Sequence, residues 1–336
     1  MLKLLSELCR LDGVSGDEGD VRDFLQKRAE RYADEVRADR LGNLIAFKRG
    51  TKPSKNKLML CAHMDEMGVI VTRVTSEGFL KFDFVGDVER RAAIGKPVLL
   101  GPEKVPGVIG CKAIHLVGKD ERKSIPKTES FYIDTGGVPV SQGTYGAFVC
   151  EPESFGQGML KAKAIDSRIG CAVMLKLLEE ELPLDVTFAF TVQKEVGARG
   201  AFGAAFSVSP EIALVLGGVS AADLPGIEKH RQICAPGKGA VLSCLDRNTI
   251  YDRGLFDRLR GLAVAHDIPW QALGDSADGT DAQAIQRSKA GVRAAAISAA
   301  VRYSHMTVNV GNLDDFENVL KLTRLFLEDI AEHGTV

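Results

Sequence analysis

The run Lys57-Leu-Met-Leu-Cys-Ala-His63 is the stretch of sequence from which the fold can be worked out. Its apolar residues are continuous rather than alternating, and Gly68 follows too soon for a helix to form. A continuous apolar run of this length is typical of a strand that is buried on both faces of a parallel sheet. We therefore expect a buried strand that ends at His63.

Strands and helices alternate on the C-terminal side of this run. Apolar periodicity predicts helices over 168–182, 199–206, 252–265, 281–287 and 313–333, and strands over 186–191, 212–216, 239–245 and 292–298. This alternation indicates an α/β fold, with a mainly parallel sheet covered by helices on both faces. Nearer the N-terminus a helix is expected over 15–34, where Ser15 and Glu18 have the spacing of a capping box.

A different sequence pattern interrupts the alternation of strands and helices between residues 69 and 158. Short β-rich runs there are separated by glycine and proline pairs, such as Gly101-Pro102 and Gly136-Gly137. We interpret 69–158 as an inserted, barrel-like β domain. The main domain is then discontinuous and consists of residues 1–68 and 159–336.

Composition excludes several classes of protein. The 336 residues are 45% hydrophobic and 26% charged, which is typical of a globular chain rather than a disordered one. The formal net charge is -2 and no dense basic run occurs, so we expect no nucleic-acid partner. No apolar run approaches the roughly 20 residues of a membrane span. The seven cysteines are odd in number and scattered, which favours reduced thiols and a cytoplasmic location.

Four polar residues lie where strands are predicted to end: His63, Asp166, Glu195 and His305. In sheets of this kind, side chains from several strand ends meet at one edge. Imidazole and carboxylate groups are the ligands that hold zinc and similar divalent ions. Each residue alone would more often be structural, but together they predict a metal site.

The contexts of these residues resemble a known family, the family forty-two metallopeptidases. These are the tetrahedral or glutamyl aminopeptidases, which share the fold of the co-catalytic zinc aminopeptidases. Six motifs occur in the family's order over essentially the whole chain: Ala62-His-Met-Asp-Glu-Met-Gly68, Lys163-Ala-Ile-Asp-Ser-Arg-Ile-Gly170, Gln193-Lys-Glu-Val-Gly-Ala-Arg-Gly200, Asp223-Leu-Pro-Gly226, Asp278-Gly-Thr-Asp281 and Val301-Arg-Tyr-Ser-His305.

The resemblance implies a site with two metal ions and one bridging carboxylate. By position, His63 resembles a ligand of the first metal and Asp65 the residue that orients it. Asp166 resembles the bridge, and Glu195 and His305 resemble the other ligands of the second metal. The resemblance also implies removal of N-terminal residues from short peptides in the cytoplasm, and assembly into large homo-oligomers.

Two departures from the family pattern concern the chemistry directly. Lys194 stands where the family has the glutamate that acts as general base, and Gly217 stands where it has an aspartate ligand of the first metal. We therefore expect at most one divalent ion per chain, zinc or else cobalt or manganese, and the pattern also allows none.

Lys194 leaves several interpretations open. Its side chain could be neutral beside a metal, could turn away, could replace a metal as the partner of Asp166 and Glu195, or could simply face solvent. Two functions follow from these alternatives. One is a working metal-dependent aminopeptidase with an altered site, and the other is a catalytically inactive paralogue that serves as a peptide-binding, structural or regulatory subunit beside an active relative.

Overall fold

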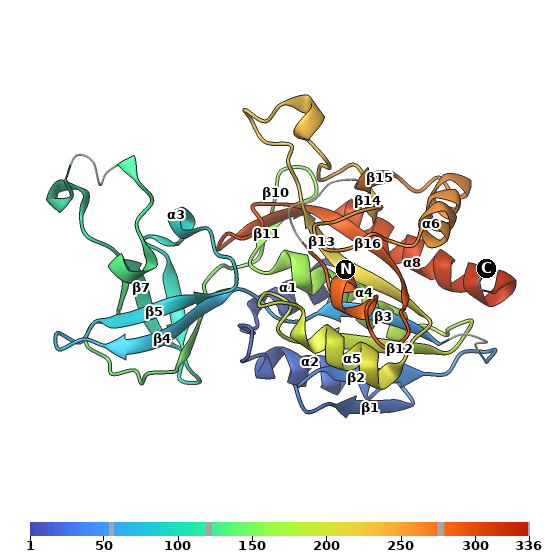
Figure 1. The fold of residues 1–336 in the computed structure, drawn as a ribbon, viewed down its shortest axis with the longest axis horizontal. Helices are drawn as coiled ribbons and strands as arrows, with labels where there is room; N and C mark the ends of the chain where they lie inside the picture. The colour runs from blue at the N-terminus through green and yellow to red at the C-terminus, as the bar shows by residue number, and fades with distance from the viewer. Residues whose placement is uncertain (54–56, 119–122, 274–278, 335–336) are drawn as a thin grey trace.

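The structure is a computed structural model, and it describes residues 1–53, 57–118, 123–273 and 279–334. Its main body is built on one large sheet (Figure 1). The four central strands are mutually parallel and lie in the order β12 (Val186–Thr191), β3 (Leu58–His63), β13 (Ile212–Ser220) and β16 (Arg293–Arg302). Their carboxyl ends therefore meet along one edge.

The flanking strands of this sheet are mostly antiparallel. Beyond β12 lie β2 (Leu44–Lys48) and β1 (Glu35–Ala38). Beyond β16 lie β17 (Asn309–Asn312), β11 (Met159–Ala162) and β10 (Glu153–Phe155), while β14 (Ala240–Ser243) and β15 (Trp270–Leu273) branch from β16. The prediction of an α/β fold with a mainly parallel central sheet is confirmed.

Helices cover both faces of the sheet, and β3 shows why its sequence is continuously apolar. Leu58, Leu60 and Ala62 join the core beneath one set of helices, and Met59 and Cys61 join the core beneath the other set. The first set comprises α1 (Leu2–Arg10), α2 (Gly19–Ala29), α4 (Ile165–Leu178), α6 (Arg253–Ala265) and α8 (Leu313–His333); the second comprises α5 (Arg199–Val208) and α7 (Ala282–Ile285).

The inserted domain is a closed six-stranded barrel that projects from the body, at the left of Figure 1. Its strands are β4 (Gly68–Val74), β5 (Leu80–Val85), β6 (Pro97–Leu100), β7 (Val105–Gly110), β8 (Tyr132–Asp134) and β9 (Tyr145–Phe148), with the short helix α3 (Arg90–Ala93) between β5 and β6. The barrel has its own apolar core. Short 3₁₀ turns cover Ile114–Leu116, Thr128–Ser130 and Lys229–Arg231.

The C-terminal boundary of the insertion differs from the expected 69–158. The barrel closes with β9, and β10 pairs with β11 in the large sheet. The difference arises because a short strand bounded by glycine has the same sequence pattern in a barrel and at the edge of a sheet. The chain therefore returns to the body before residue 153.

The capping box expected at Ser15 and Glu18 is not formed. The helix α2 begins at Gly19, and no side chain caps its first turn. Ser15 Oγ instead donates a hydrogen bond to Asp65 Oδ2 at 2.5 Å. The spacing of a capping box is present, but the hydroxyl of Ser15 donates its hydrogen bond to the buried carboxylate of Asp65 instead.

Within the described residues, no helix has both the length and the apolar character needed to cross a membrane.

Candidate functional site

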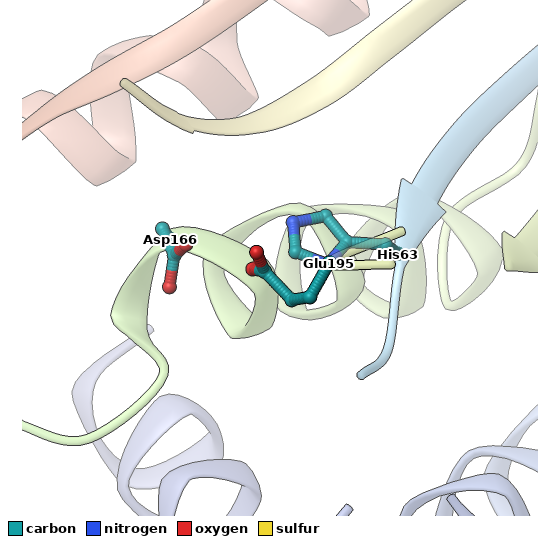
Figure 2. Close-up of side chains that lie close together, drawn as sticks. All are labelled: His63, Asp166 and Glu195. Atoms are coloured by element: carbon teal, nitrogen blue, oxygen red, sulfur yellow. The ribbon is translucent and has the colours of Figure 1, made fainter. Parts of the chain in front are cut away.

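Three of the predicted ligands form one cluster at the carboxyl edge of the sheet. One ligand atom each from His63, Asp166 and Glu195 lies within 4.8 Å of the other two. In Figure 2 the imidazole of His63 and the two carboxylates lie around a common space. His63 ends β3, Asp166 lies in the first turn of α4, and Glu195 follows β12. Segments distant in sequence are thus joined by the parallel topology.

A glycine on α4 brings Asp166 to this cluster. A Cβ placed on Gly170 would lie 2.3 Å from the carbonyl oxygen of Leu216 in β13, which is far inside van der Waals contact. Glycine at position 170 therefore permits a helix-to-strand approach that no other residue allows. That close approach fixes the first turn of α4, and with it Asp166, over the end of the sheet.

Asp65 connects the two segments that carry His63 and Glu195. Its Oδ1 lies 3.4 Å from His63 Nδ1 and accepts a hydrogen bond from the Lys194 amide, and its Oδ2 accepts one from the Glu195 amide at 3.0 Å. Together with the bond from Ser15, these contacts occupy both oxygens of a completely buried carboxylate. Such a partner fixes the orientation of a metal-binding imidazole.

A buried ion network connects the segment that follows His63 to the region around α4. Glu66 Oε1 accepts hydrogen bonds from the Gly13 amide at 2.9 Å, from Lys163 Nζ at 3.0 Å and from Arg168 Nη2 at 3.3 Å. Arg168 is fully buried on α4 and also donates to the carbonyl oxygen of Met64. The helix that carries Asp166 is thereby tied to the segment that carries His63.

Lys194 points into the cluster rather than into solvent. Its Nζ lies 3.6 Å from Glu195 Oε1, and its side chain is 15% exposed. The solvent-facing interpretation of Lys194 is therefore wrong. An ammonium group now lies beside the carboxylate that the metal site requires.

The charges of the cluster act on one another. Burial lowers the pKa of Lys194, but the carboxylates of Glu195 and Asp166 outweigh burial and hold this pKa above its ordinary value. Burial raises the pKa of Glu195, and Lys194 only partly opposes this rise. For His63, burial and Lys194 lower the pKa, whereas Asp65 and Glu195 raise it to a net value above the ordinary one. The ammonium of Lys194 thus lies among acidic groups whose negative charge it opposes.

His63, Asp166 and His305 line one pocket, but His305 lies outside the three-residue cluster. It is in the turn after β16, with a left-handed backbone at φ +63°. Its Nδ1 lies 2.8 Å from the carbonyl oxygen of Asp87, and its own carbonyl oxygen accepts a hydrogen bond from the Glu89 amide at 2.7 Å. Asp87 and Glu89 belong to the inserted barrel domain, so the barrel holds this turn. The structure shows His305 near the cluster without placing it among the grouped ligand atoms.

Gly217 also lines the pocket, where a Cβ would lie 3.1 Å from the carbonyl oxygen of Asp166. A larger residue would fit only if this backbone moved by a few tenths of an ångström. The pocket contains a further acidic residue, Asp281, which is 2% exposed and follows Thr280. Thr280 Oγ1 accepts a hydrogen bond from the Ala282 amide at 3.2 Å, but Asp281, the residue at the N-cap of α7, makes no side-chain cap. Asp278, from the same motif, lies outside the described residues.

Sequence reasoning did not identify Ser15 or Glu18 as parts of the site, and for Asp281 it favoured a turn that caps the next helix over substrate contact. Glu18 Oε1 accepts hydrogen bonds from the Gly16 amide at 2.8 Å and from the Gln193 amide at 3.0 Å, so it supports the loop that carries Lys194 and Glu195. The Ser15-Gly16 pair belongs to the family resemblance, but no local pattern indicates that Glu18 contacts a loop 175 residues away.

The donor set fits a single divalent ion. Carboxylates and imidazole are zinc ligands, and open catalytic zinc sites have three protein ligands that leave a position for water or substrate. His63, Asp166 and Glu195 supply this set, and Asp65 contacts the imidazole from behind. A second ion would need ligands beyond this cluster.

Comparisons with known proteins agree with this geometry. The sequence profile of the M42 glutamyl aminopeptidases matches residues 42–322. A putative aminopeptidase from Acetivibrio thermocellus is 35% identical over 331 residues, which cover 96% of this chain and 97% of the relative. The solved aminopeptidase APDkam598 from Desulfurococcus kamchatkensis has a TM-score of 0.92 at 31% identity, covering 98% of this chain and 94% of that one. The TET1 peptidase of Pyrococcus horikoshii, described as assembling into a tetrahedron or a large octahedral shell, has a TM-score of 0.83 at 28% identity over 96% of this chain and 97% of that one. These matches confirm the resemblance seen in the sequence motifs.

Proposed function

Because the chain belongs to the M42 glutamyl aminopeptidase family, we propose that it binds the N-terminal end of short peptides and removes the first residue slowly, with one divalent ion. The observation that carries this proposal is the grouping of ligand atoms from His63, Asp166 and Glu195 within 4.8 Å. A bound ion of this kind would polarise the scissile carbonyl and lower the pKa of a water molecule.

Asp65 and Lys194 have different roles in this proposed reaction. Asp65 holds the imidazole of His63 and the backbone of the Lys194-Glu195 loop in fixed positions. Lys194 takes the place of the family's general base, and an ammonium cannot accept a proton. A positioned general base contributes about 10²- to 10⁴-fold to a rate. Slow hydrolysis is therefore the expected property of the wild-type chain.

A second candidate function is peptide binding without hydrolysis. It is supported by the 3.6 Å contact between Lys194 Nζ and Glu195 Oε1, since an ammonium in this position can satisfy the carboxylate without any metal. In that case the chain would act as a binding or regulatory subunit beside an active relative.

Assembly and location extend the proposal. We propose that the chain forms a homo-oligomer in which the barrel domain supplies contact surface and limits access to the site, as the shells described for a structural neighbour suggest. We also propose a cytoplasmic location, which the odd number of scattered cysteines supports.

Metal analysis combined with peptide hydrolysis tests this function. The protein is purified without chelator, its metal content is measured, and aminoacyl p-nitroanilides are then offered with added zinc, cobalt or manganese. We expect close to one ion per chain, lost in His63→Ala but kept in His333→Ala, a histidine at the exposed end of α8. One ion without hydrolysis would favour the binding function, two ions would contradict the single-metal site, and no ion in any condition would contradict metal-dependent action.

A further inference from the structure

A chain of alternating charges runs from the barrel domain into the body beside the start of α2. Lys104 lies in the turn between β6 and β7 of the barrel, and its Nζ lies 2.7 Å from Asp12 Oδ2 and 3.1 Å from Asp20 Oδ2. Both aspartates belong to the body: Asp12 lies between α1 and α2, and Asp20 lies in the first turn of α2. The barrel therefore contacts the body here as well as at His305.

The backbone of Lys104 shows that this residue is held in an uncommon conformation. Its φ of +52° lies in the left-handed region, which few residues with a side chain adopt. Its amide donates a hydrogen bond to the Gly101 carbonyl oxygen at 3.0 Å, as in a tight turn where glycine or asparagine would fit more easily. The two carboxylates that the ammonium reaches give a reason for a lysine at this position.

Asp12 continues the chain of charges into the protein interior. Its Oδ2 accepts a hydrogen bond from Lys104 Nζ, and its Oδ1 accepts one from Lys163 Nζ at 2.5 Å. Lys163 is 5% exposed and also donates to Glu66 Oε1 at 3.0 Å. Burial raises the pKa of Asp12, but Lys163 and Lys104 outweigh burial and hold this pKa below its ordinary value. A buried ammonium is stable only when it is paired, so Lys163 depends on both of its carboxylate partners.

The interior end of this chain lies beside two of the candidate metal ligands. Lys163 lies three residues before Asp166, and Glu66 lies three residues after His63. The Gly13 amide donates to Glu66 Oε1 at 2.9 Å, and the Gly13 carbonyl oxygen accepts a hydrogen bond from the Glu66 amide at 2.8 Å. A displacement of the segment that begins at Asp12 would therefore disturb both segments that carry ligands.

We propose that Lys104 and Asp12 are positioning residues for the ligand cluster. Lys104 fixes Asp12 from the barrel, and Asp12 fixes Lys163 and the segment that pairs with Glu66. The inference rests on the proposed function, because the segments held in this way carry the proposed metal ligands. An exposed ion pair alone contributes little, but here several charges form one network and Lys163 is buried. Neither Lys104 nor Asp12 belongs to the six family motifs.

Zinc affinity and hydrogen exchange together test this role. We expect Lys104→Met to weaken zinc binding about fivefold and Asp12→Asn about tenfold, measured by competition with a zinc-sensitive dye. In the metal-free protein, both variants should speed hydrogen exchange in the peptide that contains the Glu66 amide, because this amide donates to Gly13. Lys104→Arg keeps the charge and should restore both properties.

The matched control is Lys161→Met, which should change neither property. Lys161 lies on β11, is 39% exposed and pairs with Glu153 instead of this network. In the background of Asp12→Asn, Lys104→Met should have little further effect, and additive losses would show that Lys104 does not act through Asp12.

Three results would overturn the proposal. These are unchanged exchange at Glu66 in both variants, exchange that rises equally over the whole chain, and faster exchange with unchanged affinity in a protein that binds zinc. A wild-type protein that binds no zinc would contradict the proposed function. Faster exchange confined to the Glu66 peptide would, in that case, still support the positioning role of Lys104 and Asp12.

Discussion

Replacing Lys194 with glutamate tests the central assumption about the site. Lys194 Nζ lies 3.6 Å from Glu195 Oε1, and two opposite charges at this distance attract by about 5 kcal/mol at an effective dielectric constant near 20. The variant Lys194→Glu converts this attraction into repulsion between two buried carboxylates. Without metal, the free energy of unfolding should therefore fall by several kcal/mol, and added zinc should restore much of it.

Gly217→Asp should supply the second half of the family pattern. Its Cβ would lie 3.1 Å from the carbonyl oxygen of Asp166, so a small shift of the backbone is needed. The double variant Lys194→Glu/Gly217→Asp should bind close to two ions per chain and hydrolyse aminoacyl p-nitroanilides about 10²- to 10⁴-fold faster than the wild type. Lys194→Glu alone should gain less, because the first metal would still lack a ligand.

The measurements are metal analysis, thermal unfolding with and without zinc, and initial rates of hydrolysis. Lys161→Glu is the matched control, because Lys161 is 39% exposed and its charge reversal lies outside the cluster. Fast wild-type hydrolysis that survives Lys194→Ala would refute the reasoning, since the base would then lie elsewhere. Fast hydrolysis that Lys194→Ala abolishes would show that the lysine itself is a working catalyst.

Three further predictions concern stability and assembly. Arg168→Met should lower the free energy of unfolding by about 3 kcal/mol in urea titrations, because it removes one partner of the buried Glu66; a change below 1 kcal/mol would contradict this role. Burial raises the pKa of Glu18 from 4.5 to about 7, so between these pH values the native state holds a proton that the unfolded state has released. The free energy of unfolding should therefore fall by about 3 kcal/mol as pH rises from 4.5 to 7. The variant Glu18→Gln should flatten this pH dependence, and an unchanged slope would count against the role of Glu18. Light scattering at micromolar concentration should detect a homo-oligomer, and a purely monomeric species would argue against assembly through the barrel.

The central part of the fold could be predicted because its strands are buried on both faces. The apolar run that ends at His63 and the strand Val186–Thr191 could be predicted from their own residues, because nearly all of those residues are buried. The edge strands β1 and β10 escaped prediction, since their residues are mostly exposed and their sequences are polar. Periodicity reports burial, and strands with little burial leave little periodicity.

The site could be predicted in its ligand types but not in its supporting contacts. His63, Asp166 and Glu195 were found from strand ends and motif order, and the structure groups them. The hydroxyl of Ser15 and the carboxylate of Glu18 act across long sequence separations, which no local pattern encodes. The direction of Lys194 was equally open, because its environment depends on how the loop after β12 is held by Asp65.

The attachment of the barrel has a mechanical consequence. β4 begins soon after His63, β11 ends just before Asp166, and Asp87 and Glu89 contact His305 through their backbone atoms. Both connections of the barrel to the large sheet, and its contacts with His305, therefore lie beside the cluster. A molecule that binds to the outer surface of the barrel should therefore change the affinity of the cluster for a metal ion.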